Sequence, residues 1–199
     1  MEKIKKKLNK EIMSSKEIFG FWIYIMSDCV LFSTLFAVYI ILHKNTFGGE
    51  NIQNISNLSY VFCETIVLLT SSFTFGMTMI SMYKNSYNKI KTIFWLTMTF
   101  IFGLIFISME INEFYQLFLE GNTWEKSAFL SAFFTLLGTH GLHVTIGLIW
   151  ILVMIIMIYT KNMCFMLEKK MICLSLFWHF LDIIWIFIFT IVYLLGYIE

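Results

Sequence analysis

Carboxylate and imidazole side chains occur in pairs, three residues apart, within otherwise apolar sequence. The pairs are Glu110 and Glu113 in "MEINEF", His140 and His143 in "THGLHV", and His179 and Asp182 in "WHFLDIIW". On a helix, residues three apart lie on the same side. Carboxylates and imidazoles projecting from facing helices are also the ligands of di-iron sites in helix bundles. A membrane-embedded, metal-dependent oxidase is therefore one candidate function.

Two other functions use the same residue types. Proton relays are built from intramembrane Asp, Glu and His, so a proton-coupled transport protein is a second candidate. However, the pairs lack the Glu-x-x-His form of di-iron bundles, and the chain shows neither an internal repeat nor the interrupted helix pair of transporters. The third candidate is a scaffold bundle, in which these pairs together with Asp28 and Glu64 only make contacts between helices.

The composition indicates that a bilayer surrounds this chain. Its 199 residues are 59% hydrophobic with a mean hydropathy of +0.78, which is more apolar surface than a soluble domain of this size can hide. Five continuous apolar runs reach the roughly 20 residues that a spanning helix needs, at about 20–42, 58–83, 92–118, 127–159 and 171–197. The sequence thus predicts an all-α polytopic membrane protein with five transmembrane helices, organised as a lysine-rich tail (1–17) and a membrane bundle (18–199). The net charge of +1 gives no basic field for nucleic acid.

The lysines predict the orientation of the chain. Twelve of the 14 lie in the N-terminal tail, the 84–91 loop and the 161–170 loop, whereas Lys44 and Lys126 alone lie in the other two connections. Because cytoplasmic loops carry the excess of basic residues, we expect a cytoplasmic N-terminus and a periplasmic C-terminus.

The fourth helix has two faces that seek neighbours. His140, His143 and Gly147 project to one side, and Gly138, Gly141 and Thr145 project to nearly the opposite side. Small residues let helix backbones approach closely, and polar residues find partners across helices. We therefore expect this helix at the centre of the bundle.

Position along each run suggests which polar groups meet. In the fifth helix, Ser175, His179, Asp182, Thr190 and Tyr193 form one stripe, and Trp178 and Trp185 lie on a different side. Asp28 and His179 each lie about 12 Å from the cytoplasmic end of their runs, and Glu110 lies near the depth of the fourth-helix histidines. From matched depth, we expect contacts between Asp28 and His179, and between Glu110 and His140 or His143.

Longer stretches carry a resemblance to a known family. "FGFWIYIMSDCVLF", "MEINEF", "SAFFTLLGTHGLHVTIGLIW" and "CLSLFWHFLDIIWIFIFTIVYLLG" resemble subunit III of the haem–copper respiratory oxidases, and among these the bacterial ubiquinol oxidases of the bo type. The resemblance runs from about Ile18 to Gly196. It implies a non-catalytic subunit of a proton-translocating ubiquinol oxidase in the bacterial inner membrane. Such a chain is expected to support subunit I, to contact subunits II and IV, and to hold phospholipid.

The resemblance also bears on cofactors and single residues. It implies no cofactor in this chain, because the haems and the copper belong to subunit I. Asp28 matches an acidic position of the family near a lipid cleft that faces subunit I. Other intramembrane polar positions of the family are matched by Glu110, His140, His143, His179 and Asp182. Glu64 departs from the cytochrome c branch, which tends to have a neutral amide there.

Overall fold

Five long helices form the bundle in the described part of the chain, which comprises residues 2–43, 58–83, 88–160 and 165–198 of the computed structural model. Their bounds are α1 Glu2–Leu42, α3 Leu58–Tyr83, α4 Lys89–Leu119, α5 Ala128–Thr160 and α6 Phe165–Ile188. The last helix continues through a π-helical segment, η1 Phe189–Leu194, into α7 Leu195–Ile198. The described residues contain no strand, so the all-α prediction is confirmed for them.

All five predicted runs are helices long and apolar enough to span a membrane. The spans are Lys16–Leu42, Leu58–Met82, Lys89–Leu119, Ala128–Thr160 and Met166–Leu194. The last begins several residues before the predicted start at 171, because the charged turn Glu168–Lys170 is part of the same helix. The orientation stays a prediction, and three of the lysines behind it, Lys44, Lys84 and Lys161, lie outside the described residues.

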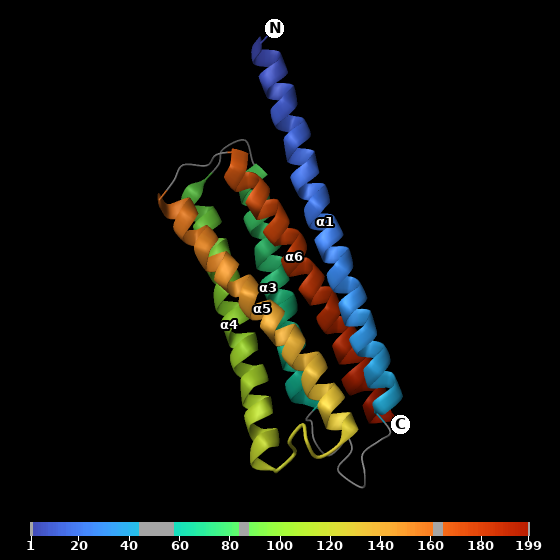
Figure 1. Ribbon diagram of the computed structural model, residues 1–199. Coiled ribbons are helices and arrows are strands. Elements are labelled where there is room, and N and C mark those ends of the chain that lie inside the picture. Colours follow the sequence, from blue (N-terminus) through green and yellow to red (C-terminus); the bar gives the residue numbers. More distant parts are fainter. Residues whose placement is uncertain (1, 44–57, 84–87, 161–164, 199) are drawn as a thin grey trace.

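The first helix extends well beyond its membrane span. α1 has 41 residues and so is about 60 Å long, roughly twice the hydrocarbon thickness. Its N-terminal part, which includes most of the predicted tail, projects past the ends of the other helices (Figure 1). The tail and the first span are therefore one continuous helix.

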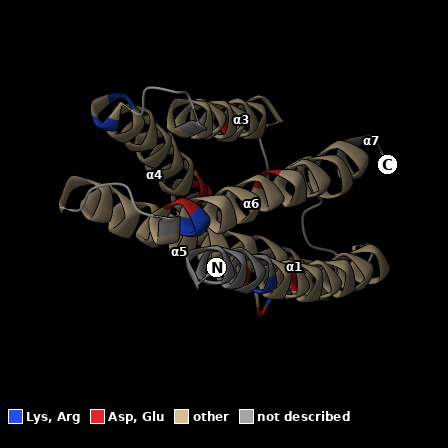
Figure 2. Ribbon diagram, turned by 90° about the horizontal axis from the view of Figure 1, so that it is seen from above, with Lys and Arg blue, Asp and Glu red and all other residues tan. Residues whose placement is uncertain are grey.

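α5 and α6 occupy the centre of the bundle. α5 packs against α1, α4 and α6, and α6 packs against α1, α3 and α5 (Figure 2). α3 and α4 pair with each other on one side, where the Thr74 and Thr99 hydroxyls are 2.9 Å apart and the Ser81 and Thr92 hydroxyls are also 2.9 Å apart. The predicted central position of the fourth helix is confirmed, and α6 shares it.

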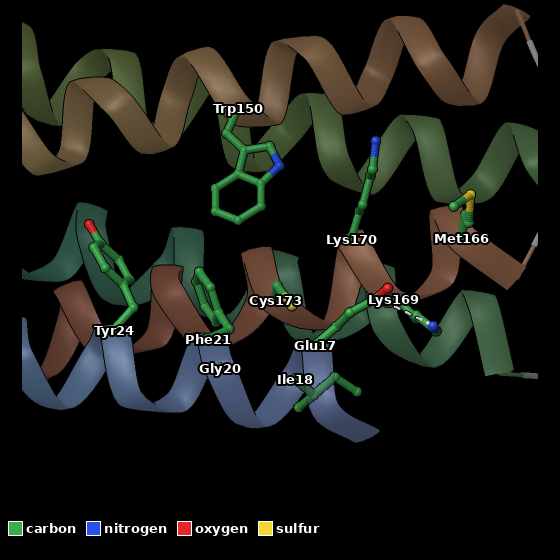
Figure 3. Close-up of a pocket in the computed structure, with 10 residues that line it drawn as sticks. All are labelled: Glu17, Ile18, Gly20, Phe21, Tyr24, Trp150, Met166, Lys169, Lys170 and Cys173. Carbon is green, nitrogen blue, oxygen red and sulfur yellow. Dashed lines mark hydrogen bonds and ion pairs between the residues drawn. The ribbon is translucent and has the colours of Figure 1, made fainter. Parts of the chain in front are cut away.

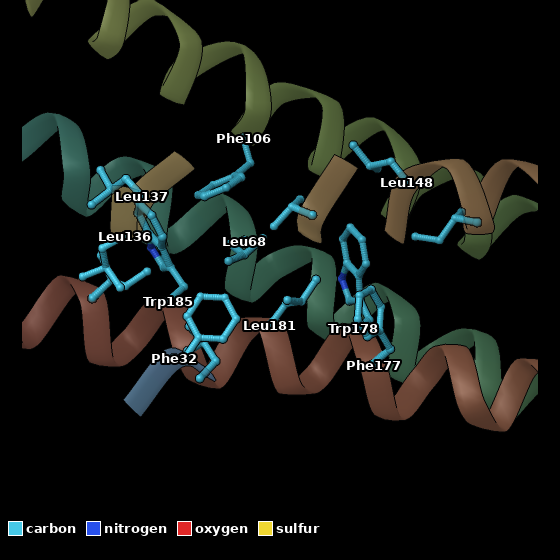
Figure 4. Close-up of a cluster of buried hydrophobic side chains, with 14 of the residues drawn as sticks. Phe32, Leu68, Phe106, Leu136, Leu137, Leu148, Phe177, Trp178, Leu181 and Trp185 are labelled. Carbon is cyan, nitrogen blue, oxygen red and sulfur yellow. The ribbon is translucent and has the colours of Figure 1, made fainter. Parts of the chain in front are cut away.

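The centre of the core is built around two tryptophans of α6 (Figure 4). The Trp178 ring fills a slot between helices, because a Cβ on Gly103 of α4 or on Gly147 of α5 would lie 3.0 Å from its ring atoms. Its indole N–H donates to Ser71 Oγ of α3 at 3.1 Å. Trp185 likewise donates to Thr65 Oγ1 of α3, also at 3.1 Å. The tryptophan side of α6 therefore faces the core.

Candidate functional site

Three glutamates gather where α3 and α4 meet the π-helical end of the last helix. Glu64 comes from α3, and Glu110 and Glu113 come from the buried stripe of α4. The hydroxyl of Tyr193 in η1 donates to both carboxylate oxygens of Glu113, at 3.1 and 3.3 Å. A π-helical turn changes the direction of the side chains that follow it. Here the segment presents Tyr193 to Glu113 in the core.

Glu64 is the most isolated of these acids. Its side chain is fully buried, and neither carboxyl oxygen has a hydrogen-bond partner within the described residues. Glu113 and Glu110, the charged groups whose fields act on it, are also acids. A buried charge without a partner is costly, so a negative charge at Glu64 contributes nothing to the stability of the bundle.

The first prediction concerns this isolated acid. Glu64→Gln keeps the shape and removes the charge, so we expect the free energy of unfolding to stay within about 1 kcal/mol of the native value or to rise. Glu113→Ala, in contrast, leaves the buried Tyr193 hydroxyl unpaired and should cost about 1–3 kcal/mol. Thermal denaturation of the full chain in mild detergent compares the two. An equal loss in both variants would show that the Glu64 charge has a partner after all.

Asp28 contacts the fourth of the five long helices and not the fifth. Its carboxylate lies 3.8 Å from Nε2 of His143, whose Nδ1–H donates to the Thr139 carbonyl at 2.7 Å. Tyr24 lies one turn earlier on α1, on the same side of the helix as Asp28. The expected contact between Asp28 and His179 is therefore wrong. Asp28 and His179 lie at similar depths along their helices, but the Asp28 side chain projects from α1 toward α5.

His140 is held by backbone and rings. Its Nε2 lies 3.3 Å from the Leu181 carbonyl of α6, and the ring packs against Phe106 and Trp185. Glu110 meets α5 at Gly141, where its carboxylate would lie 2.8–3.1 Å from an added Cβ. The expected histidine contact of Glu110 is thus replaced by close packing on a glycine one residue away.

His179 and Asp182 take part in a polar contact with α3. Ser72 Oγ lies 2.7 Å from Nδ1 of His179, and an Asp182 oxygen lies 3.7 Å from the same nitrogen. A Ser-His-Asp nucleophile needs the serine and the aspartate on opposite ring nitrogens. Because both groups approach Nδ1, this trio cannot activate the serine.

The i, i+3 pairs do not converge on a common centre. Glu110 lies against α5 and Glu113 against η1, His140 bonds α6 and His143 faces α1. Over the described ranges, no three Asp, Glu, His or Cys side chains come close enough to hold one metal ion. The geometry instead suits interhelical contacts, and it does not favour the metal-dependent oxidase.

A groove near the N-terminal half of the first span is a feature that the sequence did not reveal. It has a volume of about 490 Å³ and is lined by α1, α5 and α6 (Figure 3). Phe21, Tyr24 and Trp150 form aromatic walls, and Lys169 closes one end through an ion pair with Glu17 at 3.0 Å. Aromatic and basic residues near a span end are a signal for the membrane interface, but only the fold brings these three helices together.

Comparison with known proteins extends across the whole bundle. The chain matches the family described as cytochrome c oxidase subunit III over residues 6–197. It is 52% identical over 179 residues to cytochrome bo(3) ubiquinol oxidase subunit 3 of Pseudomonas aeruginosa, covering 90% of this chain and 85% of that protein. The subunit of the same name from Buchnera aphidicola subsp. Schizaphis graminum is 49% identical over 189 residues, covering 95% of this chain and 99% of that protein. Quinol oxidase subunit 3 of Bacillus subtilis is 43% identical over 179 residues, covering 90% and 87%.

Proposed function

This chain belongs to the cytochrome c oxidase subunit III family, and from that premise we propose that it is the non-catalytic subunit III of a bacterial ubiquinol oxidase. The complex would oxidise ubiquinol, reduce oxygen to water and translocate protons. The observation that carries the proposal is the 52% identity to a protein named as subunit 3 of a bo(3) ubiquinol oxidase over 90% of the chain. The intramembrane polar residues make contacts between helices of this chain, which is consistent with a structural role in the complex.

The proposal places the redox chemistry elsewhere in the complex. We assign the haems and the copper to subunit I, which would be the main partner, with subunits II and IV as further neighbours. This chain lies in the inner membrane with its N-terminus in the cytoplasm and its C-terminus in the periplasm. The lysine distribution supports that orientation.

The groove of about 490 Å³ supports the proposed binding of phospholipid. Its walls are mostly apolar and aromatic, which suits an acyl chain, and Lys170 at its edge suits a lipid phosphate. Asp28 lies close to this groove, because it is one turn along α1 from Tyr24, which lines the groove. The polar contact between α1 and α5 therefore borders the proposed lipid site.

Purification from native membranes tests the proposed function. A tag on the N-terminus of this chain, followed by extraction in mild detergent, should recover a larger subunit together with haem and copper. Removal of this chain from the complex should leave both cofactors with the larger subunit. Recovery of the 23.6 kDa chain without any haem-containing partner would refute the proposal.

A second prediction concerns Asp28. In the assembled oxidase, Asp28→Ala should leave the haem spectrum and the initial rate of oxygen reduction nearly unchanged, because the ionisable group that faces Asp28 is His143 of the same chain. The working life of the enzyme should shorten several-fold, because the contact that holds α1 on α5 is lost.

The conservative variant Asp28→Asn is the control for this experiment. The amide keeps the size of the side chain and its place beside His143 but loses the charge, so the working life of this variant should fall between those of the native enzyme and Asp28→Ala. The measurement is the number of turnovers before inactivation, from oxygen consumption. An immediate and complete loss of oxygen reduction in a fully assembled Asp28→Ala complex would point to direct proton transfer by Asp28.

A further inference from the structure

One imidazole lies within a membrane span and on the outside of the bundle. His179 lies within the span Met166–Leu194, about 13 Å along the helix from Lys170, the last residue of its charged turn. Its side chain is 42% exposed, whereas the neighbouring Asp182 side chain is buried. Ionisable side chains in membrane spans normally face the interior of a protein or a partner. The exposed part of the His179 side chain faces neither the interior of this chain nor a partner residue within it.

The contacts inside the chain use only one ring nitrogen. Ser72 and Asp182 both approach Nδ1 of His179, and no hydrogen bond to Nε2 is formed by any residue of the described ranges. Asp182 itself is buried, and neither of its oxygens has a hydrogen-bond partner among those residues. Ser72 and Asp182 therefore orient the ring through Nδ1. Nε2 is available to a group outside this chain.

The depth of His179 in the membrane restricts which group outside the chain can bind Nε2. Acyl chains offer no hydrogen-bonding group, and the level of Lys170, where a lipid phosphate would lie, is about 13 Å away along the helix. The groove of about 490 Å³ has a different lining and does not include His179. A polar side chain on another transmembrane helix can reach this depth, and such side chains bond across helices in membranes.

We propose that the face of α6 around His179 is a docking surface for a transmembrane helix of another oxidase subunit, which presents a hydroxyl, amide or carboxyl group to Nε2. The apolar part of the surface is formed by Ile183, 52% exposed, and by the exposed side chains of Ile186 and Phe187. These residues follow His179 along one side of α6. The inference deepens the proposed function, on which it rests, by naming the contact surface.

Three variants of the tagged full chain separate docking from folding. His179→Leu removes the polar group but keeps the bulk, so we expect about three- to tenfold less haem to co-purify per chain, the effect of one interhelical hydrogen bond. His179→Gln should restore most of the haem. Ser72→Ala removes the bond inside the chain but leaves Nε2, so its haem content should match that of the native chain. A native-like His179→Leu, or an equal loss in Ser72→Ala, would overturn the proposal.

A photo-crosslink identifies what lies on this face. A benzophenone amino acid at Ile183 in native membranes should form an adduct with another protein chain. The control position is Leu104 on α4, which is also exposed and near the middle of its span. Adducts with lipid alone at Ile183, or protein adducts no more abundant than at Leu104, would overturn the docking surface. Absence of haem from the native eluate would instead refute the proposed function, and the crosslink would still test the surface.

Discussion

Trp178→Ala is expected to lower the free energy of unfolding by about 3–5 kcal/mol, the cost of deleting a large buried aromatic side chain. The ring fills the slot between Gly103 and Gly147, so its removal leaves a cavity at the meeting point of α4, α5 and α6. Neither glycine has a side chain that could move into the space. Ser71 also loses the donor that bonds its buried hydroxyl.

Thermal denaturation of the full chain in mild detergent measures this loss. Trp124→Ala is the matched control, because Trp124 is exposed and lies in the connection between α4 and α5. The control should change stability by less than about 0.5 kcal/mol. If the two variants lose equal stability, the slot does not hold the bundle together.

Gly141→Leu is expected to destabilise the packing of α5 on α4, because the buried Glu110 side chain would have to move. A Cβ at this position would already lie 2.8 Å from a carboxylate oxygen of Glu110, and a leucine adds three more carbon atoms in the same place. Overpacking of this kind typically costs about 1–3 kcal/mol. The same assay should show a loss in that range.

Two further variants make the Gly141 prediction specific. Gly138 lies one turn earlier on α5, and nothing lies within 4 Å of a Cβ there, so Gly138→Leu should be tolerated. Glu110→Ala in the Gly141→Leu chain frees the space that the leucine needs. The double variant should therefore recover stability, and failure to recover would mean that Glu110 is not the group that collides. Such non-additivity is the expected behaviour of residues in contact.

The spans were predictable because a continuous apolar run of sufficient length has few alternatives in a membrane. The central position of α5 was predictable in part: the side with His140 is packed as expected, but on the side with the small residues Gly141 contacts Glu110 whereas nothing lies within 4 Å of a Cβ on Gly138. Both properties depend on the side chains of one helix at a time, so they can be read from the sequence of that helix alone.

The contacts between polar groups were not predictable in the same way. Asp28 was expected to meet His179 from matched depth, yet it faces His143, because rotation of each helix about its own axis decides the partner. The π-helical segment has no sequence signal here, although it positions Tyr193 against Glu113. The tryptophan side of α6 faces the core and His179 is half exposed, because the slot for Trp178 is made by glycines of two other helices.

The position of the tryptophans along the chain bears on biosynthesis. A ribosome completes α6 last, so α3, α4 and α5 enter the membrane before Trp178 and Trp185 exist to occupy the middle of the bundle. Until then, Ser71 and Thr65 lack their indole donors and the two slot glycines face a void or lipid. A nascent chain that ends before residue 178 would thus lack both the aromatic rings that fill the core and the two indole donors to α3.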